Sequence, residues 1–241
     1  MDTNITFTYD NLKIFYKKIK DLGSTYLFKE WKGEKVFLIR HDVDFDVYLA
    51  YKMAILEFEM GIKSTFFILT SSPSYNILEK KNKNYLREII KMGHEVGLHF
   101  DPRLYKENLK EAVKKEIEIL SFVTNEKIYS ISLHSPSVHG QYPLFEGLIN
   151  TYDPQFFSDN NYISDSCFSF RNKNPFLFLN NINNSMIQIL LHPMHFSNTK
   201  EDYIEIFDKG FKRYQHNIHT NFFENPIYQK QFKDKFLKNH P

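Results

Sequence analysis

Two carboxylates at the end of an apolar run are the first residues in this chain whose spacing predicts chemistry. The segment Val36–Asp44 begins with four apolar residues and ends by delivering Asp42 and Asp44, two positions apart. Alternate side chains of a strand point to the same side, so both acids would face one way and His41 the other. Neighbouring carboxylates repel unless a cation, a shared proton or solvent relieves them. We expect one to ligate a divalent metal ion and the other to act as a base.

The same pair also has a structural interpretation. An aspartate after a strand can cap the following helix by accepting hydrogen bonds from its first backbone amides, and Asp44 or Asp46 is placed to do so. A metal site requires further ligands, whereas a helix cap does not. The rest of the chain therefore decides between the two interpretations.

Strand and helix patterns alternate along the chain. Helical periodicity occupies residues 8–23, 48–61, 85–93 and 105–123, and a long helix is expected from about residue 199. Five clear strands and two weak ones are predicted: Val36–Asp44, Ser64–Leu69, His94–His99, Ile128–Leu133 and Met186–Leu191, with the weak pair at Phe156–Ser158 and Phe176–Leu179. This order is typical of a parallel sheet with right-handed crossovers. We predict an α/β fold, a single-domain distorted (β/α)7 barrel.

Polar groups concentrate where the predicted strands end. Asp42, Asp44, His99, His134 and His192 all stand at C-terminal strand ends. In barrels and in open α/β sheets, this edge is where sites are built. The pattern favours a metal-dependent site over a simple helix cap.

Composition excludes several classes of function. The formal net charge of the 241 residues is only +2, which gives no electrostatic case for a nucleic-acid partner. Cys167 is the only cysteine, so an intrachain disulfide and a thiolate cluster are excluded, and a reducing compartment is compatible. Neither a secretory signal nor an apolar run of the roughly 20 residues that a membrane span requires is visible. We expect a cytoplasmic protein without a membrane span.

The domain organisation is expected to be simple. No internal repeat or low-complexity linker interrupts the chain, so one domain is predicted over residues 1–241. Within it, residues 1–34 form an N-terminal helix and lead-in, and residues 199–241 form a C-terminal helical segment.

The motifs and their order resemble the polysaccharide deacetylase family, the metal-dependent N-deacetylases related to Nod-factor, chitin and peptidoglycan deacetylases. The resemblance spans roughly residues 36–196. Asp42-Val-Asp44 is similar to the first motif, which implies that Asp42 is the catalytic base and Asp44 a metal ligand. Gly93-His-Glu-Val-Gly-Leu-His99 is similar to the second motif, which implies that His99 is a ligand. His94 is better explained as a buried structural histidine.

One position departs from the family pattern. Arg103 stands four residues after His99, where the family usually has another ligating histidine. An arginine stays protonated and offers only donors, so it cannot bind a metal ion. Either another residue supplies the third ligand or the site has lost its metal. His134, at the end of the next strand, is our candidate for the third ligand.

The last motifs concern proton donation. Leu190-Leu-His192 is similar to the final family motif, which implies that His192 is the general acid. Asp165 resembles the aspartate that orients this histidine. Arg40 and Arg103 are predicted either to bind substrate or to form ion pairs with Asp42 and Asp101, and His195 either lies at the surface or lines the cleft beside His192.

The resemblance implies hydrolysis of an N-acetyl group on an amino sugar. Zinc fits the expected ligands, although cobalt, nickel or iron would also suit them. Without a visible export signal, we expect an acetamido sugar on a nucleotide, a lipid carrier or a growing polymer, in capsule or lipopolysaccharide synthesis. Two alternatives stay open: a hydrolase of another amide, and a catalytically inactive barrel that binds carbohydrate. Oligomeric state is not predicted.

Overall fold

The computed structural model describes residues 6–239, with side chains described up to residue 232. At its centre, β2 (Phe37–Val43) lies between β3 (Thr65–Leu69) and β8 (Ile187–Leu191). The continuous order is β6-β5-β4-β3-β2-β8-β7, with β4 at Glu95–Phe100, β5 at Ser130–Leu133, β6 at Ile149–Asn150 and β7 at Tyr162–Ser164. The short β1 (Thr25–Tyr26) pairs with the start of β2.

Every strand pairing in this sheet is parallel. Within residues 6–239, no pairing joins β6 to β7, so the sheet is open between these two edges. Helices connect most of the clear strands, as parallel strands require. The structure confirms the predicted fold class, a distorted (β/α)7 barrel.

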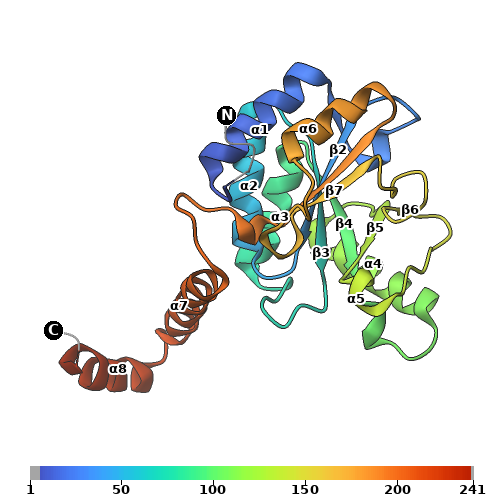
Figure 1. Cartoon of the computed structure of the whole chain (residues 1–241). Coiled ribbons are helices and arrows are strands. Elements are labelled where there is room, and N and C mark those ends of the chain that lie inside the picture. The colour runs from blue at the N-terminus through green and yellow to red at the C-terminus, as the bar shows by residue number, and fades with distance from the viewer. Residues whose placement is uncertain (1–5, 240–241) are drawn as a thin grey trace. The chain divides into compact units, whose positions relative to one another are not determined.

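The first two main helices begin and end close to the predicted positions, whereas the third begins five residues before its predicted start and the fourth begins four residues after its own. They are α1 (Tyr9–Leu22), α2 (Val47–Met60), α3 (Lys80–Lys91) and α4 (Leu109–Thr124). Figure 1 shows α1, α2 and α3 gathered on one side of the strands. Thr8 caps α1 by accepting a hydrogen bond from the Asn11 amide. Gly61 ends α2 at φ 67°, a left-handed conformation that favours glycine.

The residues of β2 alternate between two environments. Phe37 and Ile39 join the large apolar core that the helices cover, whereas Leu38 belongs to a smaller cluster on the other face. Arg40 and Asp42 have the same parity as Leu38, so they lie on the inner, concave face of the sheet. This alternation directs Arg40 and Asp42 away from the helices, whereas His41 between them faces Glu57 of α2.

Gly97 shows how tightly the inner face is packed. A Cβ atom at this position would lie 2.6 Å from both the Phe67 ring and the Ser130 hydroxyl. Only glycine lets β4 pass these two side chains. The close approach fixes the part of β4 that leads to His99.

The two weak strand predictions were wrong. Phe156–Ser158 is a turn rather than a strand, and the short helix α6 (Pro175–Phe178) covers most of Phe176–Leu179. The strands that complete the sheet are instead β6 and β7, which contain only two and three residues. The Phe156 ring is buried in the inner apolar cluster, so its apolar character reflects packing.

The chain separates into two compact units, residues 1–200 and 201–241. The second unit contains α7 (Tyr203–Phe222), which begins with a capping box between Asp202 and Glu205, and α8 (Pro226–Asn239). The boundary lies beside the start of the predicted C-terminal helical segment. One domain over residues 1–241 stays a prediction, and residues 1–5 and 240–241 lie outside the described residues. No described helix is both long and apolar enough to cross a membrane.

Candidate active site

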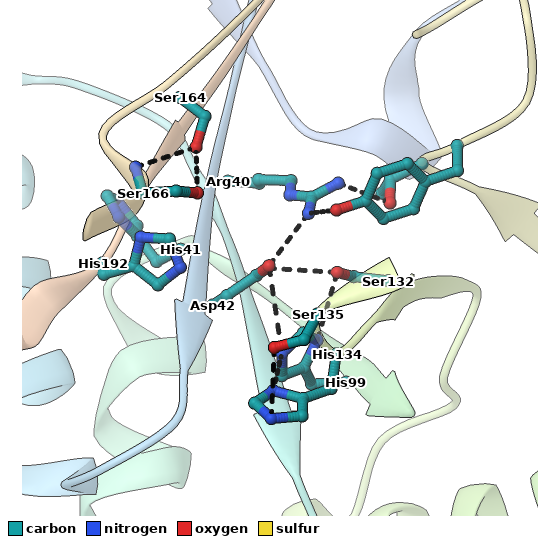
Figure 2. Close-up of polar contacts among 12 residues, drawn as sticks. Arg40, His41, Asp42, His99, Ser132, His134, Ser135, Ser164, Ser166 and His192 are labelled. Atoms are coloured by element: carbon teal, nitrogen blue, oxygen red, sulfur yellow. Dashed lines mark hydrogen bonds and ion pairs between the residues drawn. The ribbon is translucent and has the colours of Figure 1, made fainter. Parts of the chain in front are cut away.

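Three predicted metal ligands converge at the C-terminal edge of the sheet. His99 Nε2 lies 3.0 Å from Asp44 Oδ1, and His134 Nδ1 lies 3.4 Å from the same oxygen. The two imidazole nitrogens are 3.3 Å apart. Figure 2 shows the rings of His99 and His134 beside one another, near Asp42. One oxygen and two nitrogens therefore surround a common point, as a metal site requires.

The chemistry of Asp44 fits this assignment. Its Oδ1 is buried and lacks a hydrogen bond of normal geometry within the described residues, although two imidazoles face it. Burial alone would raise the pKa of Asp44, but His134 and His99 hold it well below its usual range. An ionised oxygen without a good hydrogen bond, facing two nitrogen donors, is well suited to a cation. The helix-capping role goes instead to Asp46, which accepts from the Tyr48 amide.

The strand ends bring these three predicted ligands together. Asp44 follows β2, His99 lies near the end of β4, and His134 follows β5. The His134 amide donates to the Phe100 carbonyl, which continues the β4–β5 ladder as far as the ligand. The chain then turns at Ser135, whose φ is 48°, and enters the short helix α5 (Pro136–His139).

Asp42 lies beside this ligand set. Its Oδ2 is 3.9 Å from His99 Nε2 and accepts a hydrogen bond from Arg40 Nη2 at 2.9 Å. The Ser132 hydroxyl donates to Oδ1 of the same carboxylate at 3.1 Å. Figure 2 shows Asp42 between the Arg40 guanidinium and Ser132. A buried carboxylate held at both oxygens is positioned to act as a base.

Arg40 is not placed as a substrate-binding residue. Its side chain is fully buried, and its guanidinium donates to Thr151, Gln188 and the Tyr152 hydroxyl as well as to Asp42. A guanidinium surrounded by these groups does not face a cleft. The structure corrects the predicted substrate contact and shows the alternative, the ion pair with Asp42.

His192 and Asp165 form a second cluster. His192 Nδ1 lies 2.5 Å from Asp165 Oδ1, and His192 Nε2 is 3.8 Å from Asp44 Oδ2. Burial alone would lower the pKa of His192, but the Asp165 carboxylate raises it to about 9. Asp165 itself is fully buried, and its pKa is lowered by both neighbouring histidines despite its burial. His192 is therefore held with one nitrogen on Asp165 and the other toward the ligand set.

His195 lies behind His192 and does not line a cleft. Its Nδ1 is 3.0 Å from Asp165 Oδ2, and its ring stacks at a tilt against Phe168. Only 3% of the residue is exposed, so it does not offer a surface to substrate. This corrects the predicted substrate-binding role, since His195 supports Asp165 instead.

Arg103 turns toward Asp101. Its Nε and Nη2 donate to the two oxygens of Asp101 at 2.8 and 2.5 Å. The side chain is 40% exposed, so its role in substrate binding stays a prediction. His134, rather than residue 103, lies beside Asp44 and His99.

Several residues that hold the site were missed from the sequence. Ser132 contacts both Asp42 and His99, while Thr151, Tyr152 and Gln188 hold Arg40. Ser132 could have been found, because it is two residues before His134 in a strand and must share its face. Thr151 and Tyr152 follow the two-residue strand β6, for which no sequence pattern was visible.

No family model matches this chain, and no curated protein matches it. Solved structures to which this chain is similar include CE4 family carbohydrate esterases and peptidoglycan deacetylases. Peptidoglycan deacetylase PdaC from Bacillus subtilis has a TM-score of 0.44 and 16% identity, with 86% of this chain and 96% of that chain covered. A family 4 carbohydrate esterase from Bacillus anthracis has a TM-score of 0.43 and 15% identity, with 82% of each chain covered.

A CE4 family pseudoenzyme from Bacillus anthracis is also similar, with a TM-score of 0.43 and 13% identity over 76% of this chain. This chain spans only 62% of the pseudoenzyme chain. Peptidoglycan deacetylases are among the enzymes that the sequence motifs resemble. At these identities and TM-scores the likeness assigns no activity to this chain.

Proposed function

We propose that this protein is a metal-dependent hydrolase that removes the N-acetyl group from an amino sugar. The observation that carries the proposal is the convergence of Asp44, His99 and His134. Two further groups stand close to these ligands: Asp42 Oδ2 is 3.9 Å from His99 Nε2, and His192 Nε2 is 3.8 Å from Asp44 Oδ2. A ligand set with a base and an acid beside it is what metal-assisted hydrolysis of an amide requires.

The donor atoms support zinc as the cofactor. Two imidazole nitrogens and one carboxylate oxygen suit Zn²⁺, and three protein ligands with an open position are typical of catalytic zinc. Cobalt, nickel and iron also bind such donors. When bound, a divalent ion would supply Lewis acidity toward a water molecule and the acetyl carbonyl.

Asp42 is placed to accept a proton from the attacking water. Arg40 and Ser132 hold its two oxygens, which fixes the direction of the carboxylate. Because the guanidinium is buried with it, the negative charge of Asp42 is compensated inside the protein. The base is therefore held in one position.

His192 is placed to donate a proton to the departing amine. Asp165 holds Nδ1, so Nε2 is the nitrogen that faces the ligand set. With a pKa of about 9, the ring carries its proton at neutral pH, as a general acid must. The proton passes to the sugar nitrogen as the carbon–nitrogen bond breaks, which leaves acetate and a free amino sugar.

The proposed substrate is an acetamido sugar of surface polysaccharide synthesis, in capsule or lipopolysaccharide, carried on a nucleotide, a lipid or a polymer. The resemblance of the motifs to glycan N-deacetylases supports a sugar, and we propose a cytoplasmic location for the enzyme. Acetate release would be compared for a nucleotide-linked acetamido sugar, a lipid-linked one and chitin oligosaccharides. Cell fractionation would test the location.

The decisive experiment loads the purified protein with one equivalent of Zn²⁺ and measures acetate release. We expect Asp42→Asn and His192→Gln each to lower the rate by about 10²- to 10⁴-fold, the usual contribution of a general base or acid. His139→Gln is the matched control, because His139 is exposed. A zinc-loaded protein that binds oligosaccharide but releases no acetate would support the inactive barrel. Hydrolysis of a different amide, without acetate release from acetamido sugars, would support the alternative of a hydrolase that acts on another amide.

A further inference from the structure

The Ser132 hydroxyl lies between the base and a metal ligand. Its Oγ is 3.1 Å from Asp42 Oδ1 and 3.2 Å from His99 Nδ1. β4 and β5 pair with His99 directly opposite Ser132, and the Ser132 side chain is completely buried. Within the described residues, Ser132 is the one hydrogen-bond partner of Asp42 Oδ1 and also of His99 Nδ1. The Ser132 hydroxyl therefore links Asp42 to His99 by two direct hydrogen bonds.

Hydrogen counting decides the direction of both bonds. A hydroxyl has one hydrogen, and an ionised carboxylate only accepts. Ser132 therefore donates to Asp42 and presents a lone pair to His99. His99 must donate from Nδ1, which leaves the lone pair of Nε2 for the metal ion. The nitrogen freed in this way is the one that lies 3.0 Å from Asp44.

We propose that Ser132 is a positioning residue that transmits hydrogen-bond direction from Asp42 to His99. In this arrangement, the carboxylate of Asp42 fixes the tautomer in which His99 can bind the metal ion. The inference rests on the proposed metal site and adds a role for Asp42 in metal affinity, separate from its role as a base. Such outer contacts of metal-binding histidines fix the ring and its tautomer.

The substitution Asp42→Asn separates this role from simple loss of charge. Arg40 donates to Oδ2, so the oxygen of an asparagine would take that position and its amide nitrogen would face Ser132. Ser132 would then accept from the asparagine and donate to His99 Nδ1. His99 would carry its proton on Nε2 and lose its free lone pair there. Loss of charge also weakens metal binding, but that effect does not pass through Ser132.

The test is a double-mutant cycle on the Zn²⁺ dissociation constant, measured by titrating metal-free protein. Removing an outer contact of a ligand typically costs 10- to 100-fold in affinity, and we expect about 10-fold for Ser132→Ala. Asp42→Asn should weaken binding by about 100-fold in the wild-type background and by clearly less than 10-fold in the Ser132→Ala background. Ser132→Thr keeps the hydroxyl and should restore the affinity.

Ser130→Ala is the matched control. Ser130 lies on the same face of β5 and is equally buried, but its hydroxyl donates to Glu95. It should leave zinc affinity unchanged, and thermal unfolding of each metal-free variant verifies that it is folded. Equal effects of Asp42→Asn in both backgrounds, or failure of threonine to restore binding, would overturn this inference alone. A folded wild-type protein that binds no zinc would overturn it together with the proposed function.

Discussion

His134 Nδ1 lies 3.4 Å from Asp44 Oδ1, although the two residues follow strands that are not neighbours in the sheet. β5 is adjacent to β4, and the end of β4 supplies His99 to the same point. Arg103, in the turn after β4, directs its guanidinium to Asp101. The third ligand of the proposed site therefore comes from the strand next to the one that the resemblance implies.

The first prediction concerns this third ligand. His134→Ala should abolish stoichiometric zinc binding, with a loss larger than the roughly 10- to 100-fold seen for outer contacts, because a ligand is removed. Arg103→Ala should retain one equivalent, since Arg103 pairs with Asp101 outside the ligand set. Metal content after dialysis measures both. Full zinc content in His134→Ala would exclude His134 as a ligand.

The second prediction concerns the buried ion pair of Arg40 and Asp42. Arg40→Met should lower the free energy of unfolding by about 3–5 kcal/mol, because it leaves a buried charge without its partner. Adding Asp42→Asn removes that charge and should recover part of the loss. Urea unfolding of the metal-free proteins gives both values. If the double variant were no more stable than Arg40→Met, the contributions of Arg40 and Asp42 to the free energy of unfolding would not be coupled.

The local parts of the fold were predictable from the sequence. β2 is buried on both faces, and the two-residue spacing of Asp42 and Asp44 sets their common side. Because the C-terminal ends of parallel strands share one edge, histidines at those ends were expected to converge. Asn174 and Pro175 were an overlooked sign of the helix α6: the asparagine caps it and the proline occupies its first turn.

The contacts that hold the site were not predictable in the same way. Arg40 is held by Thr151, Tyr152 and Gln188, which are far from it in sequence, and the first two follow a strand of two residues. So short a strand has no measurable periodicity. The two-residue spacing of Arg40 and Asp42 suggested their ion pair. It could not show that Arg40 is buried, because that burial depends on these distant partners.

The third prediction concerns the support of His192. Asp165→Asn should lower kcat for acetate release by about 100-fold or more with KM little changed, because an amide cannot accept from both histidines and no longer raises the pKa of His192. Asp159→Asn, at an exposed aspartate, is the matched control. Steady-state kinetics on both variants make the comparison. If Asp165→Asn had the same kcat as the control, Asp165 would not support His192 as the general acid.

The fourth prediction concerns the face of β2 opposite the site. Glu57 of α2 is fully buried and accepts hydrogen bonds from the Tyr16 and Ser64 hydroxyls, both at 2.5 Å, and it lies 2.7 Å from His41 Nε2. The other nitrogen of His41 lies 3.2 Å from the Leu191 carbonyl, just before His192. Burial alone would raise the pKa of Glu57, but His41 and its other partners lower it below its ordinary value of 4.5.

Because the folded pKa of Glu57 is depressed, its stabilising effect is complete above about pH 4.5 and is lost as the pH falls through the folded value. Glu57→Gln should cost about 1–3 kcal/mol at pH 7, since an amide leaves a buried donor unsatisfied. The difference in unfolding free energy between wild type and this variant should shrink as the pH falls below 4.5. Glu59→Gln, at an exposed position of the same helix, should show neither effect. A wild-type advantage that is constant from pH 7 to strong acid would mean that Glu57 is not ionised in the folded protein.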